Sequence, residues 1–124
     1  MYFITTIKLP WDKFNALWPN PNPKTGGRLF DREDLHEFKT CWGYYSNFEE
    51  AKKIVLENLT DIYENGSYNL AVIENLDEGS LFATEELWFS AKPLKNEEGY
   101  IDAYDVKEID KPERFANFCG WALA

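Results

Sequence analysis

The chain has 124 residues, of which 44% are hydrophobic and 28% charged, a composition that suits one globular domain with a single core. Its formal net charge is −9, and residues 63–124 hold 13 of the 22 acidic side chains but only 5 of the 13 basic ones. This balance argues against general nucleic-acid binding, which needs a face rich in lysine and arginine. It favours a partner with a basic surface, although acidity that merely keeps the protein soluble stays an open interpretation.

The cytoplasm is the expected location. Cys41 and Cys119 are too few for a secreted disulfide scaffold, although one long-range bridge between them stays open. The first residues lack the basic stretch and the cleavage site of a signal peptide. No segment approaches the roughly 18 apolar residues of a membrane span, so we expect no contact with a membrane.

The first predicted element is a strand over residues 2–8, and an irregular excursion over residues 10–39 follows it. Residues 19–27 read Pro-Asn-Pro-Asn-Pro-Lys-Thr-Gly-Gly, which cannot form regular structure. A long excursion inside a compact domain is more often functional than structural, so we predict that this one serves binding. In the rival interpretation, Trp11 and Trp18 cover a sheet face and complete the core.

Two cations in the excursion, Lys24 and Arg28, lie beside a glycine pair whose backbone amides could approach an anion. They form a weak candidate for an anion-binding site. A loop that binds no ligand is the simpler interpretation of the same residues.

A strand over residues 40–45 leads into the clearest element, a long amphipathic helix over about residues 47–64. Ser46 and Glu49 match the Ser-x-x-Glu capping box, and Asn65-Gly66 supplies the stop. The apolar side chains that recur every three or four positions are Phe48, Ala51, Val55, Leu59 and Ile62.

Three more strands are predicted over residues 68–74, 86–91 and 100–106, and short turns join them into an antiparallel meander. The unbroken apolar run of the first predicts a central place in the sheet, and Pro93 is expected to end the second. A short helix capped by Asp110 follows, with proline in its first turn. The aromatic side chains expected to anchor this tail are Phe115, Phe118 and Trp121.

These elements give the order ββαβββα in one domain over residues 1–124. The expected fold class is therefore α+β, a single antiparallel sheet with one long amphipathic helix packed on one face. No internal repeat interrupts this order.

Several motifs occur in a characteristic order: Gly-Tyr-Tyr at 43–45 before the capped helix, Tyr-Asn-Leu-Ala-Val-Ile-Glu at 68–74, and Trp-Phe at 88–89. In this order the chain resembles a family of small proteins found in phages and gut bacteria, over roughly residues 2–9 and 40–120. It departs from that family at residues 10–39, where a short connection is the pattern, and at Cys41-Trp42, where the family has a basic residue. The resemblance transfers no catalytic residue, and its phage setting implies interference with a host defence protein.

Few residues offer catalytic chemistry. His36 is the single histidine and has no second ligand at zinc spacing. Cys41 could pair with His36 in space, but a buried, inert thiol is the usual occupant of a strand. No calcium loop, Walker sequence or dinucleotide-binding glycine pattern is present. We therefore expect no enzyme, no metal and no cofactor.

Aromatic side chains are the unusual feature, with five tryptophans, seven tyrosines and nine phenylalanines. A domain of this size can hardly bury every tryptophan, and exposed tryptophan and tyrosine are typical of binding hot spots. Tyr100, Asp102 and Tyr104 alternate onto one strand face, which is either a binding surface or the wet face of the sheet. The predicted binding residues are Trp11, Trp18, Trp42, Trp88, Tyr100, Asp102, Tyr104, Lys24 and Arg28.

We expect a non-enzymatic binding protein that inhibits a bacterial defence protein through an acidic, aromatic-rich surface, with a basic host protein as partner. The alternative is a sponge for a nucleotide signal, which needs stacking aromatics and cations such as Lys24, Arg28, Lys92 or Arg114. An acidic immunity protein or antitoxin is the third hypothesis, and the sequence does not separate it from the first.

Overall fold

The computed structural model describes residues 1–8, 39–79, 83, 85–116 and 119–122. Within them lies a five-stranded antiparallel sheet with the strand order β2-β1-β3-β4-β5. Its strands are β1 (Tyr2–Ile7), β2 (Lys39–Tyr45), β3 (Leu70–Asn75), β4 (Glu85–Lys95) and β5 (Ile101–Ile109). The expected α+β class and the ββαβββ order are confirmed. The predicted excursion lies outside the described residues up to position 38, and Lys39 already belongs to β2.

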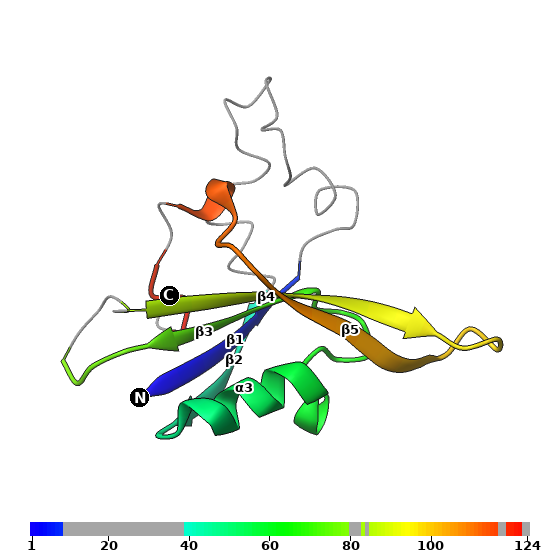
Figure 1. Cartoon of the computed structure of the whole chain (residues 1–124), viewed down its shortest axis with the longest axis horizontal. Helices are drawn as coiled ribbons and strands as arrows, with labels where there is room; N and C mark the ends of the chain where they lie inside the picture. Colours follow the sequence, from blue (N-terminus) through cyan, green and yellow to red (C-terminus); the bar gives the residue numbers. More distant parts are fainter. Residues whose placement is uncertain (9–38, 80–82, 84, 117–118, 123–124) are drawn as a thin grey trace.

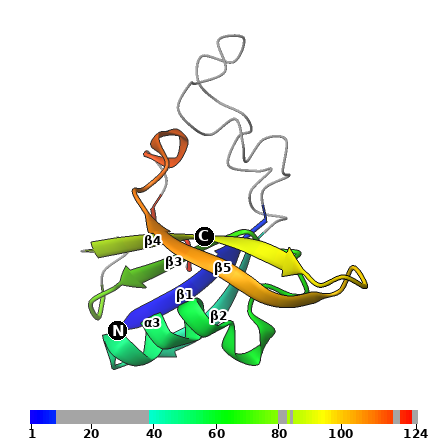
Figure 2. The same ribbon diagram turned by 45° about the vertical axis from the view of Figure 1, so that its right-hand side comes forward.

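The sheet separates two layers. Helix α3 (Phe48–Glu57) covers one face, and the short 3-10 helix η3 (Glu113–Phe115) lies on the other side (Figures 1 and 2). The apolar cluster under α3 is formed by Ile4, Ala51, Val55, Ile62, Tyr63, Ala71, Ile73, Phe89 and Ala91. The cluster on the opposite face is formed by Ile7, Leu70, Val72, Trp88, Phe115 and Trp121.

Strand β3 supplies side chains to both clusters. Ala71 and Ile73 point toward α3, while Leu70 and Val72 point toward the C-terminal residues. Because both faces of β3 are covered, its apolar run is continuous rather than alternating. The predicted central position of this strand is confirmed.

The helix is shorter than the predicted one. It ends at Glu57, because Asn58 takes the left-handed conformation (φ 51°, ψ 43°). The Asn58 side chain accepts a hydrogen bond from the Tyr63 amide at 3.0 Å and donates one to Asp61 at 3.2 Å. A short polar side chain that bonds the nearby backbone favours this conformation in asparagine. The prediction of a long helix to residue 64 is therefore wrong.

A 3-10 turn, η2 (Leu59–Asp61), replaces the last part of the predicted helix. Thr60 and Asp61 have φ values of 59° and 53°, which no α-helix accommodates. Ile62 and Tyr63 are nevertheless fully buried. The apolar period was thus a correct guide to burial, although a turn rather than a helix delivers these two side chains.

The helix begins one residue later than predicted. Asn47 is the N-cap, with an extended backbone (φ −110°, ψ 120°), and its side chain accepts a hydrogen bond from the Glu50 amide at 3.2 Å. The capping box of Ser46 and Glu49 is not formed. Glu49 and Glu50 both lie in the first turn, where the helix dipole stabilises negative charge.

Replacing Asn47 with alanine is expected to lower the free energy of unfolding by about 1 kcal/mol, because the Glu50 amide loses its partner. Ser46→Ala is the matched control, since Ser46 is exposed and precedes the cap, and its effect should stay within about 0.5 kcal/mol. Urea denaturation of both variants measures the difference. An equal loss in the two variants would contradict the assignment of the cap.

Strand β4 continues past Pro93, so the prediction that this proline ends the strand is wrong. Pro93 pairs with Tyr104 of β5, whereas the pairing of β3 with β4 stops at Ser90. Pro93 therefore lies where β4 has one neighbouring strand among those described, and a missing N–H is tolerated there. From this point β4 and β5 project beyond the sheet as a two-stranded arm (Figure 1). A Cβ on Gly66 (φ 84°) would lie 2.8 Å from Cδ1 of Ile101, so the base of the arm packs closely on the turn after η2.

The tail also differs from the prediction. Helix η3 is one 3-10 turn that follows Pro112, and no side chain caps it, so the predicted cap at Asp110 is wrong. Phe115 and Trp121 are buried as expected. Phe118 lies outside the described residues.

Candidate functional site

Among the described residues, the predicted binding residues do not converge on one site. Trp11, Trp18, Lys24 and Arg28 lie outside the described residues. Trp42 is half-buried against the cluster under α3, and its Nε1 donates a hydrogen bond to Oγ1 of Thr6 at 2.6 Å.

Trp88 lies inside the molecule. It is 1% exposed, and its ring stacks on Phe115 and meets Trp121 edge to face, with centroid distances of 5.6 and 5.3 Å. A partner cannot reach a side chain in this position. The binding role predicted for Trp88 is therefore replaced by a role in the core.

The predicted face of Tyr100, Asp102 and Tyr104 is split. Tyr100 (69% exposed) and Asp102 lie on the arm, whereas Tyr104 is half-buried and its ring centroid is 5.2 Å from that of Tyr63. The Tyr63 hydroxyl donates to the Val55 carbonyl at 2.7 Å. Burial raises the pKa of both Tyr63 and Tyr104, so both phenols stay neutral and support the core rather than a proton transfer.

Within the described residues, neither thiol lies in a catalytic arrangement. Cys41 is exposed on β2, so the prediction of a buried thiol is wrong, and it forms no disulfide with Cys119. His36, its predicted partner, lies outside the described residues. Within the part of the chain that the structure describes, no three histidine, cysteine or acidic side chains gather to hold a metal ion.

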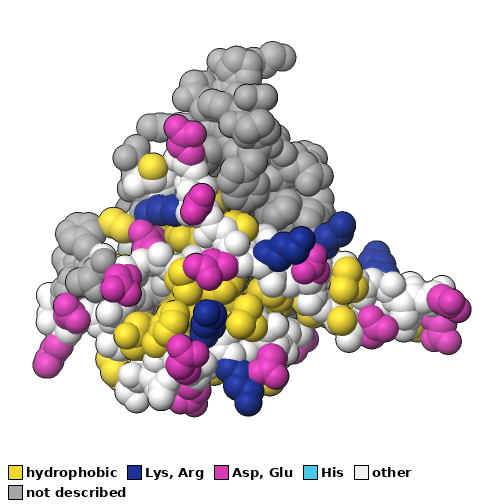
Figure 3. Space-filling view, in the orientation of Figure 1, with side chains coloured by type: hydrophobic (Ala, Val, Ile, Leu, Met, Phe, Trp, Pro, Cys, Tyr) yellow, Lys and Arg dark blue, Asp and Glu magenta, His cyan; other side chains and the backbone are white. Residues whose placement is uncertain are grey.

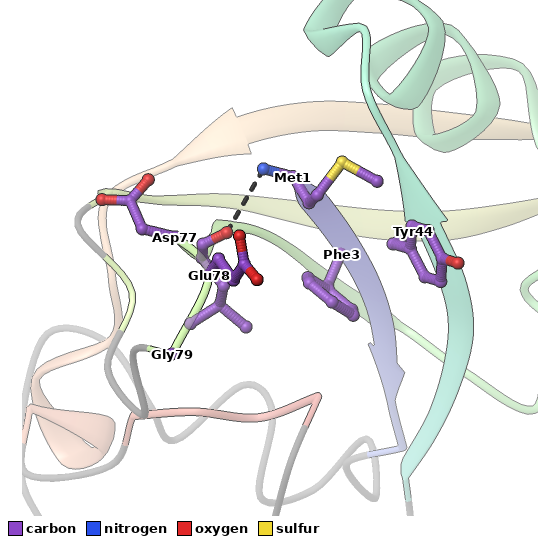
Figure 4. A pocket seen from close by; sticks show the side chains of 7 residues that line it. Met1, Phe3, Tyr44, Asp77, Glu78 and Gly79 are labelled. Carbon is purple, nitrogen blue, oxygen red and sulfur yellow. Dashed lines mark hydrogen bonds between the residues drawn. The ribbon is translucent and has the colours of Figure 1, made fainter.

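An open groove of about 420 Å³ lies on the sheet face opposite α3, at the end of β1 and β2. Its lining comprises Met1 and Phe3, Tyr44 of β2, and Leu76 with residues 77–79 of the loop after β3. The rings of Phe3 and Tyr44 lie side by side, 5.6 Å apart and tilted by 43°, with Asp77 and Glu78 on the opposite side of the groove (Figure 4). Tyr44 is 61% exposed, so most of its ring is available to a partner.

A bulge in β2 directs Tyr44 into this groove. Phe3 pairs with Tyr44 and Thr5 with Cys41, so Trp42 and Gly43 together oppose the single residue Ile4. Gly43 has φ 97°, a conformation open to glycine at little cost. Because the bulge adds one residue, Trp42 faces α3 and Tyr44 faces the opposite side.

Backbone pairing holds the acidic wall of the groove in place. The Met1 nitrogen donates to the Leu76 carbonyl at 3.2 Å, and the Leu76 amide donates to the Met1 carbonyl at 2.9 Å. Asp77 and Glu78 follow directly and are exposed. The charged groups that line the groove are these two carboxylates and the Met1 ammonium, with neither lysine nor arginine, so one negative charge remains in excess. Its field therefore attracts cations.

A buried carboxylate lies next to the groove on the same face. Glu74, which pairs with Phe3 across the sheet, accepts hydrogen bonds from the Trp121 amide at 3.0 Å and the Ala122 amide at 2.9 Å. Burial raises the pKa of Glu74, and the amide hydrogen bonds partly oppose this shift. Both oxygens of Glu74 are occupied, so this carboxylate fixes the C-terminal residues rather than serving a ligand.

Three further polar contacts tie down residues of the C-terminal tail. Glu86 accepts hydrogen bonds from Lys111 Nζ at 2.7 Å and from Trp121 Nε1 at 3.1 Å. Lys39 Nζ donates to the Trp121 carbonyl at 2.6 Å. Residues from β2, β3 and β4 thus converge on Trp121, which covers the apolar cluster on the face opposite α3.

Comparison with protein-family models, curated proteins and solved structures found no match to this chain. Among the described residues, no helix is both long and apolar enough to cross a membrane. The groove residues Met1, Phe3 and Tyr44 were missed by the sequence reasoning. The available signal was Gly43 inside a predicted strand, which indicates a bulge and a change of face.

Proposed function

We propose that this protein is a non-enzymatic binding protein that receives a basic segment of another protein in the groove beside Phe3 and Tyr44. The observation that carries the proposal is the combination of two adjacent aromatic rings with the carboxylates of Asp77 and Glu78. An arginine or lysine side chain is attracted to both, through the faces of the rings and through charge. Exposed tyrosine is also a frequent hot-spot residue.

The volume of the groove limits the size of the group that it can bind. About 420 Å³ accommodates one or two side chains and not a folded domain. The groove would therefore anchor a basic residue within a larger contact, since stable protein interfaces bury more than about 1,000 Å² in total.

The resemblance to phage proteins supplies a biological setting for this contact, in which the partner is a host defence protein with a basic surface, such as a nuclease. Inhibition would follow from masking that surface. An immunity protein or antitoxin would use the same chemistry. A nucleotide ligand is less compatible with this groove, because Asp77 and Glu78 repel phosphate.

Tyr44→Ala is expected to weaken binding of the partner at least tenfold, because truncation of a hot-spot tyrosine costs about 2 kcal/mol. The experiment uses immobilised wild-type, Tyr44→Ala and Tyr100→Ala proteins as baits in bacterial lysate, with mass spectrometry of the eluate. Tyr100→Ala is the matched control, because Tyr100 is similarly exposed but lies in the turn between β4 and β5. A specific partner should be enriched by the wild type and by Tyr100→Ala but not by Tyr44→Ala.

The role of the acidic wall, formed by Asp77 and Glu78, is tested with the partner that this experiment identifies. Binding should weaken as salt is raised, and the double variant Asp77→Asn/Glu78→Gln should flatten that salt dependence. Binding that is unaffected by Tyr44→Ala, or that does not respond to salt, would contradict the proposal.

A further inference from the structure

Strand β5 is an edge strand of the sheet. Among the described strands it pairs only with β4, so its outer side presents a row of N–H and C=O groups without a strand partner there. The strand has nine residues and contains neither proline nor glycine. An edge of this length and regularity is a template for a further strand.

Charged and apolar side chains alternate over residues 105–107, at the centre of this edge. Asp105 and Lys107 point away from α3, and Val106 points toward it and packs partly against the cluster beneath. The Lys107 ammonium and the Asp105 carboxylate are 3.5 Å apart, with side chains 71% and 42% exposed. Both groups therefore remain accessible to a second charged partner.

We propose that two copies of this chain associate by antiparallel pairing of their β5 strands, with the two-fold axis at Val106. In this register Asp105 lies opposite Lys107 of the second copy, and the symmetry repeats that pair. Val106 lies opposite its own copy, and Ala103 lies opposite Ile109. The two five-stranded sheets become one continuous sheet.

Side-chain chemistry selects this register from the neighbouring ones. In a two-fold antiparallel pair, residues that lie opposite one another have their side chains on the same face of the sheet. Neighbouring residues of one strand point to opposite faces, so the two-fold axis must pass between a residue and its own copy. An axis at Asp105 or at Lys107 places each of these residues opposite itself, and like charges repel there. An axis at Tyr104 leaves Asp105 opposite Ala103 and Lys107 opposite Ile101. Only the axis at Val106 brings opposite charges together.

The flanking residues extend this complementarity. Lys92 of β4 pairs with Asp105 across the sheet, so the proposed contact creates an alternating row of Lys92, Asp105 and the second copy's Lys107. On the α3 side, Figure 3 shows hydrophobic side chains gathered over the space between α3 and β5. Val106 packs partly against the apolar cluster on this side, and there it would meet its own copy. The pairing ends at residues 103 and 109, because Asp102 would next face Asp110.

A contact of seven residues from each strand is small, so the predicted dissociation constant is on the order of 10 μM or higher. Sedimentation velocity and light scattering of the whole chain, at physiological ionic strength and up to about 1 mM protein, should show a concentration-dependent dimer. Asp105→Lys and Lys107→Asp each place like charges opposite one another, so each variant alone should associate at least tenfold more weakly.

The decisive measurement is an equimolar mixture of these two variants. The Asp105→Lys copy then presents two lysines to two aspartates of the Lys107→Asp copy, and dimerisation should return as a heterodimer. Asp77→Lys is the control, because it changes net charge as much as Asp105→Lys does but lies in the groove. It should leave dimerisation unchanged.

Three outcomes would overturn the proposal. They are a wild type that stays monomeric at the highest concentration, a dimer that persists undiminished in the single variants, and a mixture that does not recover association. Circular dichroism of each variant confirms that the fold is retained. The result is independent of the groove, since Tyr44→Ala should dimerise like the wild type.

Discussion

Replacing Trp88 with alanine is expected to lower the free energy of unfolding by about 3–5 kcal/mol. The side chain is fully enclosed between Phe115 and Trp121, and its removal leaves a cavity that the sheet cannot close. Urea denaturation followed by tryptophan fluorescence and far-ultraviolet circular dichroism measures the loss.

Two other substitutions serve as comparisons for the stability loss expected of Trp88→Ala. Nε1 of Trp88 is buried and has no hydrogen-bond partner among the described residues, so Trp88→Phe keeps most of the packing and should cost less than about 1.5 kcal/mol. Tyr44→Ala removes an exposed ring and should change stability by no more than about 0.5 kcal/mol. A Trp88→Ala protein as stable as the Tyr44→Ala protein would contradict the placement of Trp88 in the core.

Replacing Glu74 with alanine is expected to lower the free energy of unfolding by about 3 kcal/mol. The amides of Trp121 and Ala122 would lose their acceptors inside the protein, and Trp121 would lose part of its attachment. Glu85→Ala on β4 is the control, because Glu85 is exposed, and its effect should stay within about 0.5 kcal/mol. Equal effects of the two substitutions would show that Glu74 does not hold the C-terminal residues.

The same carboxylate should give the protein a distinctive pH dependence. Burial, helped by the negative charge of Glu86, raises the pKa of Glu74 above its ordinary value of 4.5. The folded state then binds this proton more tightly than the unfolded chain does. The stability gained in this way is complete below about pH 4.5 and is lost as the pH rises through the raised pKa.

Glu74→Gln isolates this contribution, because glutamine does not titrate and the remaining groups are common to both proteins. The free energy of unfolding of the wild type, minus that of Glu74→Gln, should fall as the pH rises from about 4.5 and become constant above the raised pKa. Urea denaturation at a series of pH values gives both curves. A difference that grows with pH would reverse the sign of the shift and contradict the burial argument.

Local sequence patterns predicted most of the sheet. The apolar run in β3 indicated a strand covered on both faces, and the three strands after the helix form the expected meander. The length of the helix was not predictable from its apolar period, because Asn58 ends it through contacts with Asp61 and Tyr63. Pro93 was misjudged because whether a strand has one neighbour or two depends on the tertiary arrangement.

The candidate site was less predictable than the fold. Strict alternation places Trp42 and Tyr44 on the same face, and the bulge at Gly43 separates them. Trp88 looked like a candidate for exposure because its residue type is common at interfaces, whereas the C-terminal segment that covers it is distant in sequence. Glu74 gave no sign of burial, since its partners are backbone amides 47 and 48 residues away.

The attachment of Trp121 has a consequence for the order of folding during synthesis. The cluster under α3 and its partly buried neighbours lie within residues 1–106. This part of the core can therefore form before the last residues are made. The opposite cluster gains its cover only when Phe115 and Trp121 arrive. A nascent chain between these two stages exposes Ile7, Leu70, Val72 and Trp88 as one apolar strip. Chaperone binding and misassembly should be concentrated in that interval.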